Sequence, residues 1–324
     1  MNNIVRTTLS LILIFGCWGN TVEAKDSFNE STKQKILSLQ QKKWAHGSPD
    51  CKLNTDPSIE IFQYDKSSYV LRQNKCTNYE APFIYVLFGS DKILILDTGA
   101  TESAVDFPLY DTVQNLILDQ SIEGEIDERE LLVIHSHSHG DHYAGDLQFK
   151  DKPNVVVIEP NSAGIEAFFS FSNQEQVEID LGGRKITAIY SPGHQEEAIS
   201  IYDSQTQWLL TGDTFYPGYV YVKDWDNYKK SIKRLASFIE ENGVSAILGA
   251  HIEMTSKAGE YYPIGSTYQP DEASLVLMPK DLSELNLQLQ KQNESEIINL
   301  NGLIVEEMGL LSRTISHIAR WILQ

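Results

Sequence analysis

The apolar residues of this chain fall into short strand-like runs and longer stretches with helical spacing. The short runs are rich in β-branched and aromatic residues and are separated by polar turns, which predicts β-strands. These strands are expected at residues 59–64, 68–72, 83–88, 92–96, 131–134, 154–158, 176–181, 185–190, 198–202 and 208–211. Helices are expected at residues 34–43, 103–118 and 163–171, and around 232–239, where apolar side chains share one face. Strands followed by a helix, and then the same succession again, predict an α/β fold with two sheets packed face to face and helices outside.

The last part of the chain has a different pattern. Its apolar residues recur four and three apart at Ile304, Met308, Leu311, Ile315, Ile318 and Ile322. This stripe predicts an amphipathic terminal helix, and we expect residues 281–324 to form a C-terminal helical extension that packs on its own domain. Self-association and contact with a membrane surface are the alternatives. Of these two, Arg313 and Arg320 on the polar face favour contact with a membrane surface.

The densest polar cluster is the segment Ser136–His142, which directly follows the apolar run 131–134. Three histidines and one aspartate lie within six residues, and such side chains are costly to bury without partners. A strand that opens into a loop can direct His137 and His139 toward one metal ion. Asp141 and His142 would then face a second ion beside it. The spacing therefore predicts a metal site.

Three later turns can supply the ligands that such a site still needs. His194 ends the turn 191–194, Asp213 lies in the turn 211–214, and His251 follows Gly249 and Ala250. Each turn comes after an apolar run and contains glycine, so each is expected where a strand ends in a loop. Upstream, Asp97 follows the run 93–96 in the same way.

The H-x-H-x-D-H segment and these turns, in this order, resemble the metallo-β-lactamase superfamily from about residue 55 to residue 255. The resemblance implies a four-layer αβ/βα sandwich over residues 25–280, with the metal site at the open edge between the sheets. It also implies two Zn²⁺ ions, zinc being the default metal for nitrogen-rich sites. The implied ligands are His137, His139 and His194 for the first ion, Asp141, His142 and His251 for the second, and Asp213 between them. Asp97 would hold the ligand histidines in position.

The same resemblance implies a zinc-dependent hydrolase in which a metal-bridging hydroxide attacks the substrate and Asp141 orients it. True β-lactamases of the superfamily carry Cys or Ser where this chain has Asp213, so we expect a small-molecule lactone, ester or thioester as substrate. A periplasmic β-lactamase and a non-catalytic metal-binding protein of the same fold are the alternatives. A di-iron redox site is disfavoured, because it normally has a carboxylate where this chain has His139.

The remaining candidate residues are given structural roles. His135 continues the alternation of the ligand histidines but is not required by the family pattern, and His46 and His317 lie outside every motif. Tyr216 and Tyr219 are expected to pack rather than to donate to a developing oxyanion. The loop 251–267 is expected to line the substrate cleft.

The N-terminus predicts export. Arg6, an apolar segment at 9–16 and the cleavage signal Val22-Glu23-Ala24 form the pattern of a signal peptide over residues 1–24. The mature protein would be periplasmic or secreted, although a lipoprotein anchored at Cys17 is an alternative. Cys51 and Cys76 form an even pair that suits an oxidising compartment, so we expect a disulfide between them rather than two free thiols.

Charge narrows the range of partners. The formal net charge of −19 repels phosphate backbones, so nucleic acid is not an expected partner.

Overall fold

The computed structural model describes residues 28–121, 127–292 and 294–309. The expected signal peptide at 1–24, Cys17, His317 and the terminal stripe from Leu311 onward lie outside the described residues. The elements are α1 (Glu30–Gln41), η1 (Cys51–Leu53), β1 (Ile59–Asp65), β2 (Ser68–Gln73), β3 (Phe83–Phe88), β4 (Lys92–Leu96), α2 (Leu109–Gln120), β5 (Glu130–Ile134), α3 (Gly140–Tyr143), η2 (Ala144–Gln148), β6 (Val155–Val157), α4 (Ser162–Phe169), β7 (Gln176–Asp180), β8 (Lys185–Tyr190), β9 (Ile199–Asp203), β10 (Trp208–Gly212), β11 (Tyr219–Val222), α5 (Trp225–Glu241), β12 (Ala246–Gly249), β13 (Val276–Leu277), α6 (Pro279–Lys291), β14 (Ile298–Leu300) and β15 (Leu303–Glu307).

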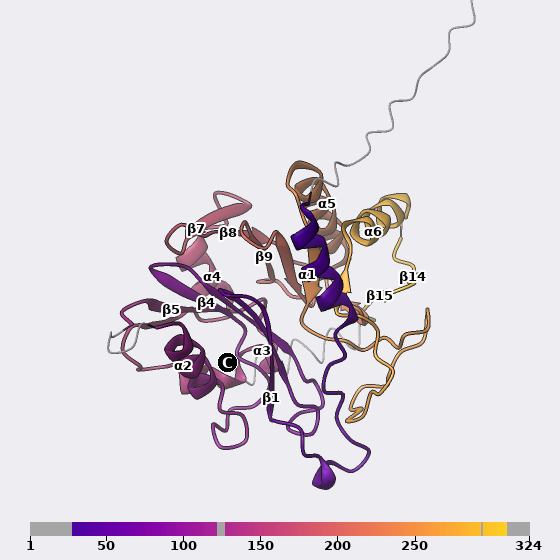
Figure 1. Ribbon diagram of the computed structural model, residues 1–324. Coiled ribbons are helices and arrows are strands. Elements are labelled where there is room, and N and C mark those ends of the chain that lie inside the picture. The colour runs from indigo at the N-terminus through magenta and orange to yellow at the C-terminus, as the bar shows by residue number, and fades with distance from the viewer. Residues whose placement is uncertain (1–27, 122–126, 293, 310–324) are drawn as a thin grey trace, which may run out of the picture.

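Two six-stranded sheets form the centre of the molecule (Figure 1). The first has the order β1-β2-β3-β4-β5-β6, antiparallel up to β4 and parallel from β4 to β6. The second has the order β13-β12-β10-β9-β8-β7, with β10 and β12 parallel. Strands β1 to β10 match the ten expected strands closely, because their runs are rich in apolar and β-branched residues.

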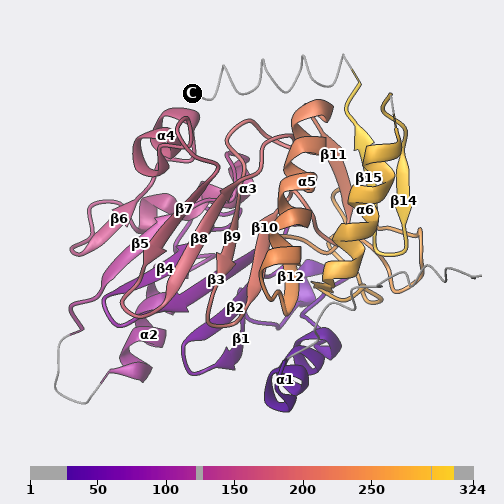
Figure 2. The same ribbon diagram turned by 90° about the horizontal axis from the view of Figure 1, so that it is seen from above.

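Apolar side chains fill three layers of core. One cluster joins the inner faces of the two sheets and includes Tyr85 and Trp208. A second lies between α2 and the outer face of the first sheet, and a third lies between the second sheet and the helices α5 and α6. Figure 2 shows α2 on one side of the paired sheets and α5 with α6 on the other. The arrangement confirms the predicted four-layer αβ/βα sandwich.

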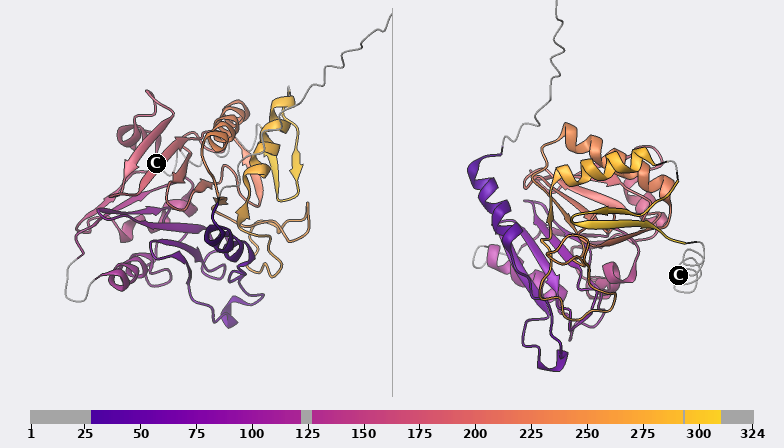
Figure 3. Two further views of the ribbon diagram at one scale, coloured as in Figure 1. Left: turned by 45° about the horizontal axis from the view of Figure 1, so that its top comes forward. Right: turned by 90° about the vertical axis from the view of Figure 1, so that its right-hand side faces the viewer.

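Near its C-terminus the described chain adds a small sheet of order β11-β15-β14. Ile304 pairs with Tyr219 of β11 and with Asn299 of β14, so the prediction of a helical extension over residues 281–324 is wrong for residues 298–300 and 303–307, which form strands. Leu303, Ile304 and Val305 are all buried, which suits a strand paired on both sides better than an amphipathic helix. Figure 3 shows this sheet and α6 beside α5. The expected domain boundary at residue 280 falls inside α6, whose Leu282, Leu285 and Leu289 pack in the same core as α5.

Two helices begin where a proline or a capping side chain sets their first residue, and not where the apolar spacing alone predicts. The helix expected from residue 103 begins only at Leu109, because Pro108 disfavours helical backbone at Phe107 and thereby delays the start. Helix α5 begins at Trp225, directly after its N-cap residue Asp224, whose side chain accepts a hydrogen bond from the backbone of Asn227. Within the described ranges, no helix combines the length and the apolar character that crossing a bilayer requires.

Candidate metal centre

Strand direction brings the predicted ligands to one edge of the sandwich. Strands β4 and β5 are parallel, so Asp97 and His137, which follow them, lie at the same end of the first sheet. Strands β8, β10 and β12 also run in one direction, so the turns of His194, Asp213 and His251 lie together at one end of the second sheet.

Gly212 allows the two sheets to approach closely at this edge. Its φ of +51° lies in the left-handed region, and a Cβ there would come within 2.4 Å of the Ser136 side chain. Glycine is therefore needed just before Asp213, where the second sheet meets the loop after β5.

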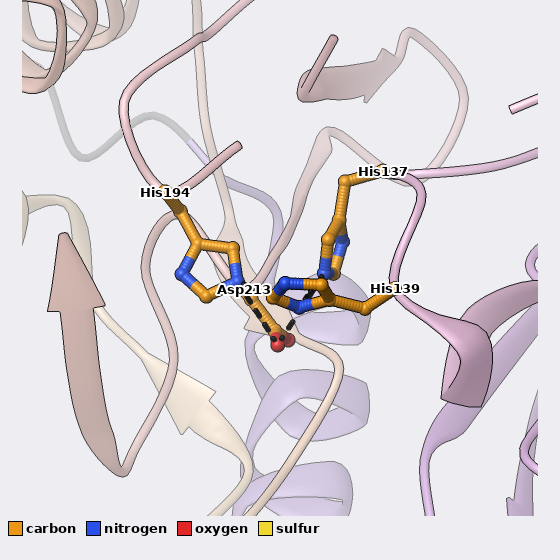
Figure 4. A group of neighbouring side chains, drawn as sticks. All are labelled: His137, His139, His194 and Asp213. Carbon is orange, nitrogen blue, oxygen red and sulfur yellow. Dashed lines mark hydrogen bonds and ion pairs between the residues drawn. The ribbon is translucent and has the colours of Figure 1, made fainter. Parts of the chain in front are cut away.

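The first ligand group contains His137, His139, His194 and Asp213, each offering one donor atom within 4.8 Å of the others. His139 Nδ1 lies 2.9 Å from His137 Nε2 and 3.2 Å from His194 Nε2. Asp213 Oδ2 lies 3.7 Å from both His137 Nε2 and His194 Nε2. Figure 4 shows the three rings and the carboxylate converging on one point.

The second group contains Asp141, His142 and His251. Asp141 Oδ2 lies 3.3 Å from His142 Nε2 and 3.2 Å from His251 Nε2. Asp213 also borders this group, because its Oδ2 is 3.6 Å from His142 Nε2 and its Oδ1 is 3.5 Å from His251 Nε2. The structure thus brings all seven predicted ligands together, with Asp213 between the two groups.

Hydrogen bonds behind three of the rings decide which nitrogen faces the centre. His194 Nδ1 donates to the carbonyl oxygen of Tyr221 at 2.8 Å, and His251 Nδ1 donates to that of Glu80 at 3.0 Å. His142 Nδ1 lies 2.9 Å from Asp97 Oδ2. A carbonyl or carboxylate oxygen accepts here, so Nδ1 carries a proton in each of these rings and Nε2 is the nitrogen that faces the centre. Metal ligation through Nε2 requires this placement of the Nδ1 proton behind the ring.

The electrostatics of the two groups differ. Burial, and then the neighbouring His194, lower the pKa of His139 to about 3, so its ring is neutral. Burial also lowers the pKa of His251, but the carboxylates of Asp213 and Asp141 outweigh it and raise this pKa to about 9. Burial raises the pKa of Asp141, yet the adjacent His142 and His251 bring it well below its usual value. The centre therefore holds ionised carboxylates that attract positive charge.

The donor set fits a pair of metal ions. The Oδ1 atom of Asp213 is buried and has no hydrogen-bond donor among the described residues, although a buried carboxylate oxygen normally has one. Inward-facing imidazole nitrogens and carboxylate oxygens, with no lysine or arginine between them, provide the ligands that zinc prefers. Two overlapping groups around one aspartate fit two ions.

His135 is not part of the cluster, although it follows the same alternation. It is fully buried, with Nδ1 at 3.0 Å from the carbonyl oxygen of Ile158 and Nε2 at 2.9 Å from Asp146 Oδ1. It therefore ties β5 to the segment after α3. His46 lies elsewhere, beside Tyr268.

The two tyrosines after Asp213 are held by neighbouring groups. The hydroxyl of Tyr216 is 2.9 Å from the carbonyl oxygen of Tyr219 and 3.0 Å from Glu253 Oε2, and Tyr219 donates to Glu306 at 2.6 Å. These three contacts agree with the expected packing roles.

Several residues around the centre were not expected from the sequence. Gln195 contacts His139, Ser136 contacts Asp97, and the carbonyl oxygens of Tyr221 and Glu80 orient ligand histidines. Gln195 and Ser136 had an available signal, because each is the direct neighbour of a predicted ligand. Backbone carbonyls carry no residue-specific signal at all.

Cys51 and Cys76 are joined by a disulfide, as the even pair predicted. The bond ties the short helix η1 to the segment before β3. That segment includes Glu80, whose carbonyl oxygen accepts the hydrogen bond from His251. The disulfide thus supports one side of the centre.

Comparison with known proteins agrees with this geometry. The family model of the metallo-beta-lactamase superfamily matches residues 79–251, more than half of the chain and all seven ligands. The chain belongs to the metallo-β-lactamase superfamily.

Its relatives include hydrolases. The chain is 24% identical over 222 residues to the acyl-coenzyme A thioesterase MBLAC2 of Homo sapiens, covering 57% of this chain and 77% of that protein. It is 32% identical over 85 residues to a hydroxyacylglutathione hydrolase of Legionella pneumophila, covering 26% and 33%. A solved metallo-beta-lactamase superfamily protein from Sulfolobus tokodaii is 15% identical, with a TM-score of 0.42 over 81% of this chain and 94% of that one. The two named hydrolases support hydrolase activity in this chain.

Proposed function

We propose that this protein is a binuclear zinc hydrolase that cleaves a thioester or a related ester or lactone. The observation that carries the proposal is the complete ligand set, divided into two groups around Asp213. A protein of this fold that had lost turnover would be expected to lack at least one ligand. The three-histidine group would hold one ion, and Asp141, His142 and His251 would hold the other.

When bound, zinc would polarise the scissile carbonyl and lower the pKa of a water molecule enough to make it a nucleophile at neutral pH. The residues of the chain supply positioning and proton transfer. Asp141 is the most exposed of the carboxylates at the centre, with its side chain 20% accessible, and its Oδ2 lies beside both His142 and His251. As an ionised carboxylate, it can accept the proton of the attacking water at Oδ2.

The thioester class is placed first because of the relatives. Acyl-coenzyme A and acylglutathione, the substrates in the names of two relatives, are both thioesters. The strongly acidic chain favours a carrier with little negative charge over a polyanionic one. An acyl thioester of a small uncharged thiol is therefore the preferred test substrate.

The test is a rate panel on the zinc-loaded protein. It compares one acyl group on an uncharged thiol, on coenzyme A and on a simple alcohol, together with an acyl-homoserine lactone and a β-lactam. The variant His251→Ala removes a ligand, and His46→Ala serves as the matched control, because His46 lies outside the centre.

We expect thioester hydrolysis that falls by at least about 100-fold in His251→Ala and is unchanged in His46→Ala, because one of the two ions would be lost. A dominant β-lactam rate would contradict the substrate class. The absence of metal-dependent turnover on every substrate would contradict the enzymatic role.

We also propose that the protein is exported. The disulfide between Cys51 and Cys76 supports this, because such bonds persist in oxidising compartments. Fractionation of cells that produce the protein, with mass spectrometry of its mature N-terminus, tests the proposal. A mature protein beginning at Lys25 would support cleavage by a signal peptidase, a lipidated Cys17 would support the anchored alternative, and an intact chain in the cytosol would contradict export.

A further inference from the structure

A chain of contacts runs from Ser136 through His137 to His139. Ser136 Oγ donates a hydrogen bond to Asp97 Oδ2 at 2.9 Å, and His137 Nδ1 lies 3.1 Å from that Oγ. Because the hydroxyl hydrogen points to Asp97, the Oγ accepts from His137 Nδ1–H. His137 Nε2 then faces His139 Nδ1 at 2.9 Å.

The far end of this chain consists of Gln195 and Lys223. His139 Nε2 contacts the amide nitrogen of Gln195, and the amide oxygen of Gln195 lies 3.5 Å from Lys223 Nζ. Lys223 is only 5% exposed, and its Nζ is also 3.5 Å from Glu196. A buried ammonium attracts an amide oxygen, so it favours the orientation that places the amide nitrogen of Gln195 on His139.

Where the amide nitrogen of Gln195 faces His139 Nε2, that ring nitrogen accepts, and the ring proton is then on Nδ1. However, Nδ1 is the atom that faces His137 and His194, so it is the atom that would bind a metal ion. Ligation therefore needs the opposite tautomer, with the proton on Nε2 and an acceptor facing it.

Rotation of the Gln195 amide by 180° supplies that acceptor, because it exchanges the oxygen and nitrogen positions. We propose that Gln195 is a positioning residue whose amide selects the ring nitrogen of His139 that carries the proton, and that Lys223 biases this choice against ligation. Zinc affinity at the three-histidine position is then set in part by two residues that are not ligands. The inference rests on the proposed function only in taking this cluster to be a zinc site.

The position of Gln195 is fixed by the turn that carries His194. The backbone N–H groups of Lys223 and Asp224 both donate to the carbonyl oxygen of Gly193 at 2.9 Å. Gly193 has a φ of +141°, and a Cβ there would lie 2.4 Å from Cα of Tyr228. The turn is thus held against the end of β11 and the start of α5, which keeps Gln195 between His139 and Lys223.

The test measures zinc affinity by competition with a chromophoric chelator, for the wild type and three variants. Gln195→Glu places an obligate acceptor on His139 Nε2, so we expect tighter binding of the first zinc ion than in the wild type. Gln195→Ala removes the acceptor and is expected to weaken that ion by about tenfold or more. Lys223→Met removes the opposing charge and is expected to tighten binding severalfold.

A second measurement reads the tautomer directly. Long-range ¹H–¹⁵N spectra of the zinc-loaded protein should show the proton of His139 on Nε2. A proton on Nδ1 in the loaded protein would overturn the proposal. A zinc affinity of Gln195→Ala equal to that of the wild type would also overturn the proposal. If only the Tm of this variant fell, Gln195 would contribute to stability and not to zinc binding.

The outcomes remain separate from those of the proposed function. If the zinc affinities follow the expected order but no substrate is hydrolysed, the positioning role stands and the hydrolase proposal fails. If the protein hydrolyses thioesters but Gln195→Ala and Gln195→Glu bind zinc equally, the hydrolase proposal stands and the positioning role fails.

Discussion

Replacement of Asp97 by asparagine tests how the centre is held together. Asp97 is 1% exposed and accepts three hydrogen bonds, from Ser136 N at 2.7 Å, Ser136 Oγ at 2.9 Å and His142 Nδ1 at 2.9 Å. In Asp97→Asn the amide oxygen can keep the backbone bond, but the amide nitrogen then faces His142 Nδ1–H. Two donors oppose each other, and the tautomer that directs His142 Nε2 to the centre loses its support.

The magnitude follows from the bonds that are lost. A hydrogen bond to a charged group contributes about 1.5–3 kcal/mol, so the free energy of unfolding without zinc should fall by about that amount. Loss of the group that orients a ligand histidine typically weakens metal binding by about 10–100-fold, which corresponds to about 1.4–2.8 kcal/mol. We expect the weakened ion to be the one at Asp141, His142 and His251.

Two assays measure these effects separately. Chelator competition gives the two zinc affinities, and urea unfolding in excess chelator gives the stability of the metal-free protein. Asp146→Asn is the matched control, because Asp146 Oδ1 holds the non-ligand His135 at 2.9 Å and Thr98 Oγ1 at 2.8 Å. It should reduce stability without changing zinc affinity. Wild-type affinity in Asp97→Asn, or an equal loss in Asp146→Asn, would refute the reasoning.

Three further predictions concern stability. Replacing Cys51 and Cys76 by serine removes a disulfide between residues 25 positions apart in the sequence. The free energy of unfolding, measured by urea titration, should fall by about 3 kcal/mol, and an unchanged value would contradict the presence of the disulfide. Arg184 Nη2 pairs with the fully buried Asp203 at 2.6 Å. Arg184→Met should therefore lower the free energy of unfolding by about 3–5 kcal/mol, because it leaves the buried Asp203 carboxylate unpaired. Adding Asp203→Leu should restore most of this stability, and no recovery would contradict the explanation by an unpaired buried charge. Burial, and then the nearby Arg72, lower the pKa of Lys75 from 10.5 to about 8, so the folded state loses this proton at lower pH than the unfolded state does. The free energy of unfolding should therefore rise with pH between about 8 and 10.5. In urea titrations, the wild type should gain about 2 kcal/mol of stability relative to Lys75→Met between pH 7.5 and 9.5. Parallel pH profiles of the two proteins would contradict the shifted pKa.

The sequence by itself determines the candidate ligand set, since each candidate lies where an apolar run ends in a turn. Strand direction then places these turns at one edge, as β4 with β5 and β10 with β12 show. Local pattern is sufficient here, because burial along a strand and the glycine of a tight turn both leave a residue-specific signal.

Alternation alone does not separate His135 from the ligand histidines, although the family pattern does not require it. Alternation suggests that it shares the face of His137 and His139, but β5 ends at Ile134 and the period of two ends with it. Its partners, the carbonyl oxygen of Ile158 and Asp146, come from later elements. Residues 303–307 give a second example, because their apolar spacing suits a helix until β11 and β14 pair with them on both sides.

Tertiary structure alone decides how the ligands are oriented. The carbonyl oxygens of Tyr221 and Glu80 fix the tautomers of His194 and His251, and Gln195 contacts His139 from the turn after β8. A carbonyl is present at every residue, so nothing in the sequence marks the two that act here. The sequence therefore records which side chains can bind metal, whereas the packing of distant segments determines which ring nitrogen each histidine directs to the centre.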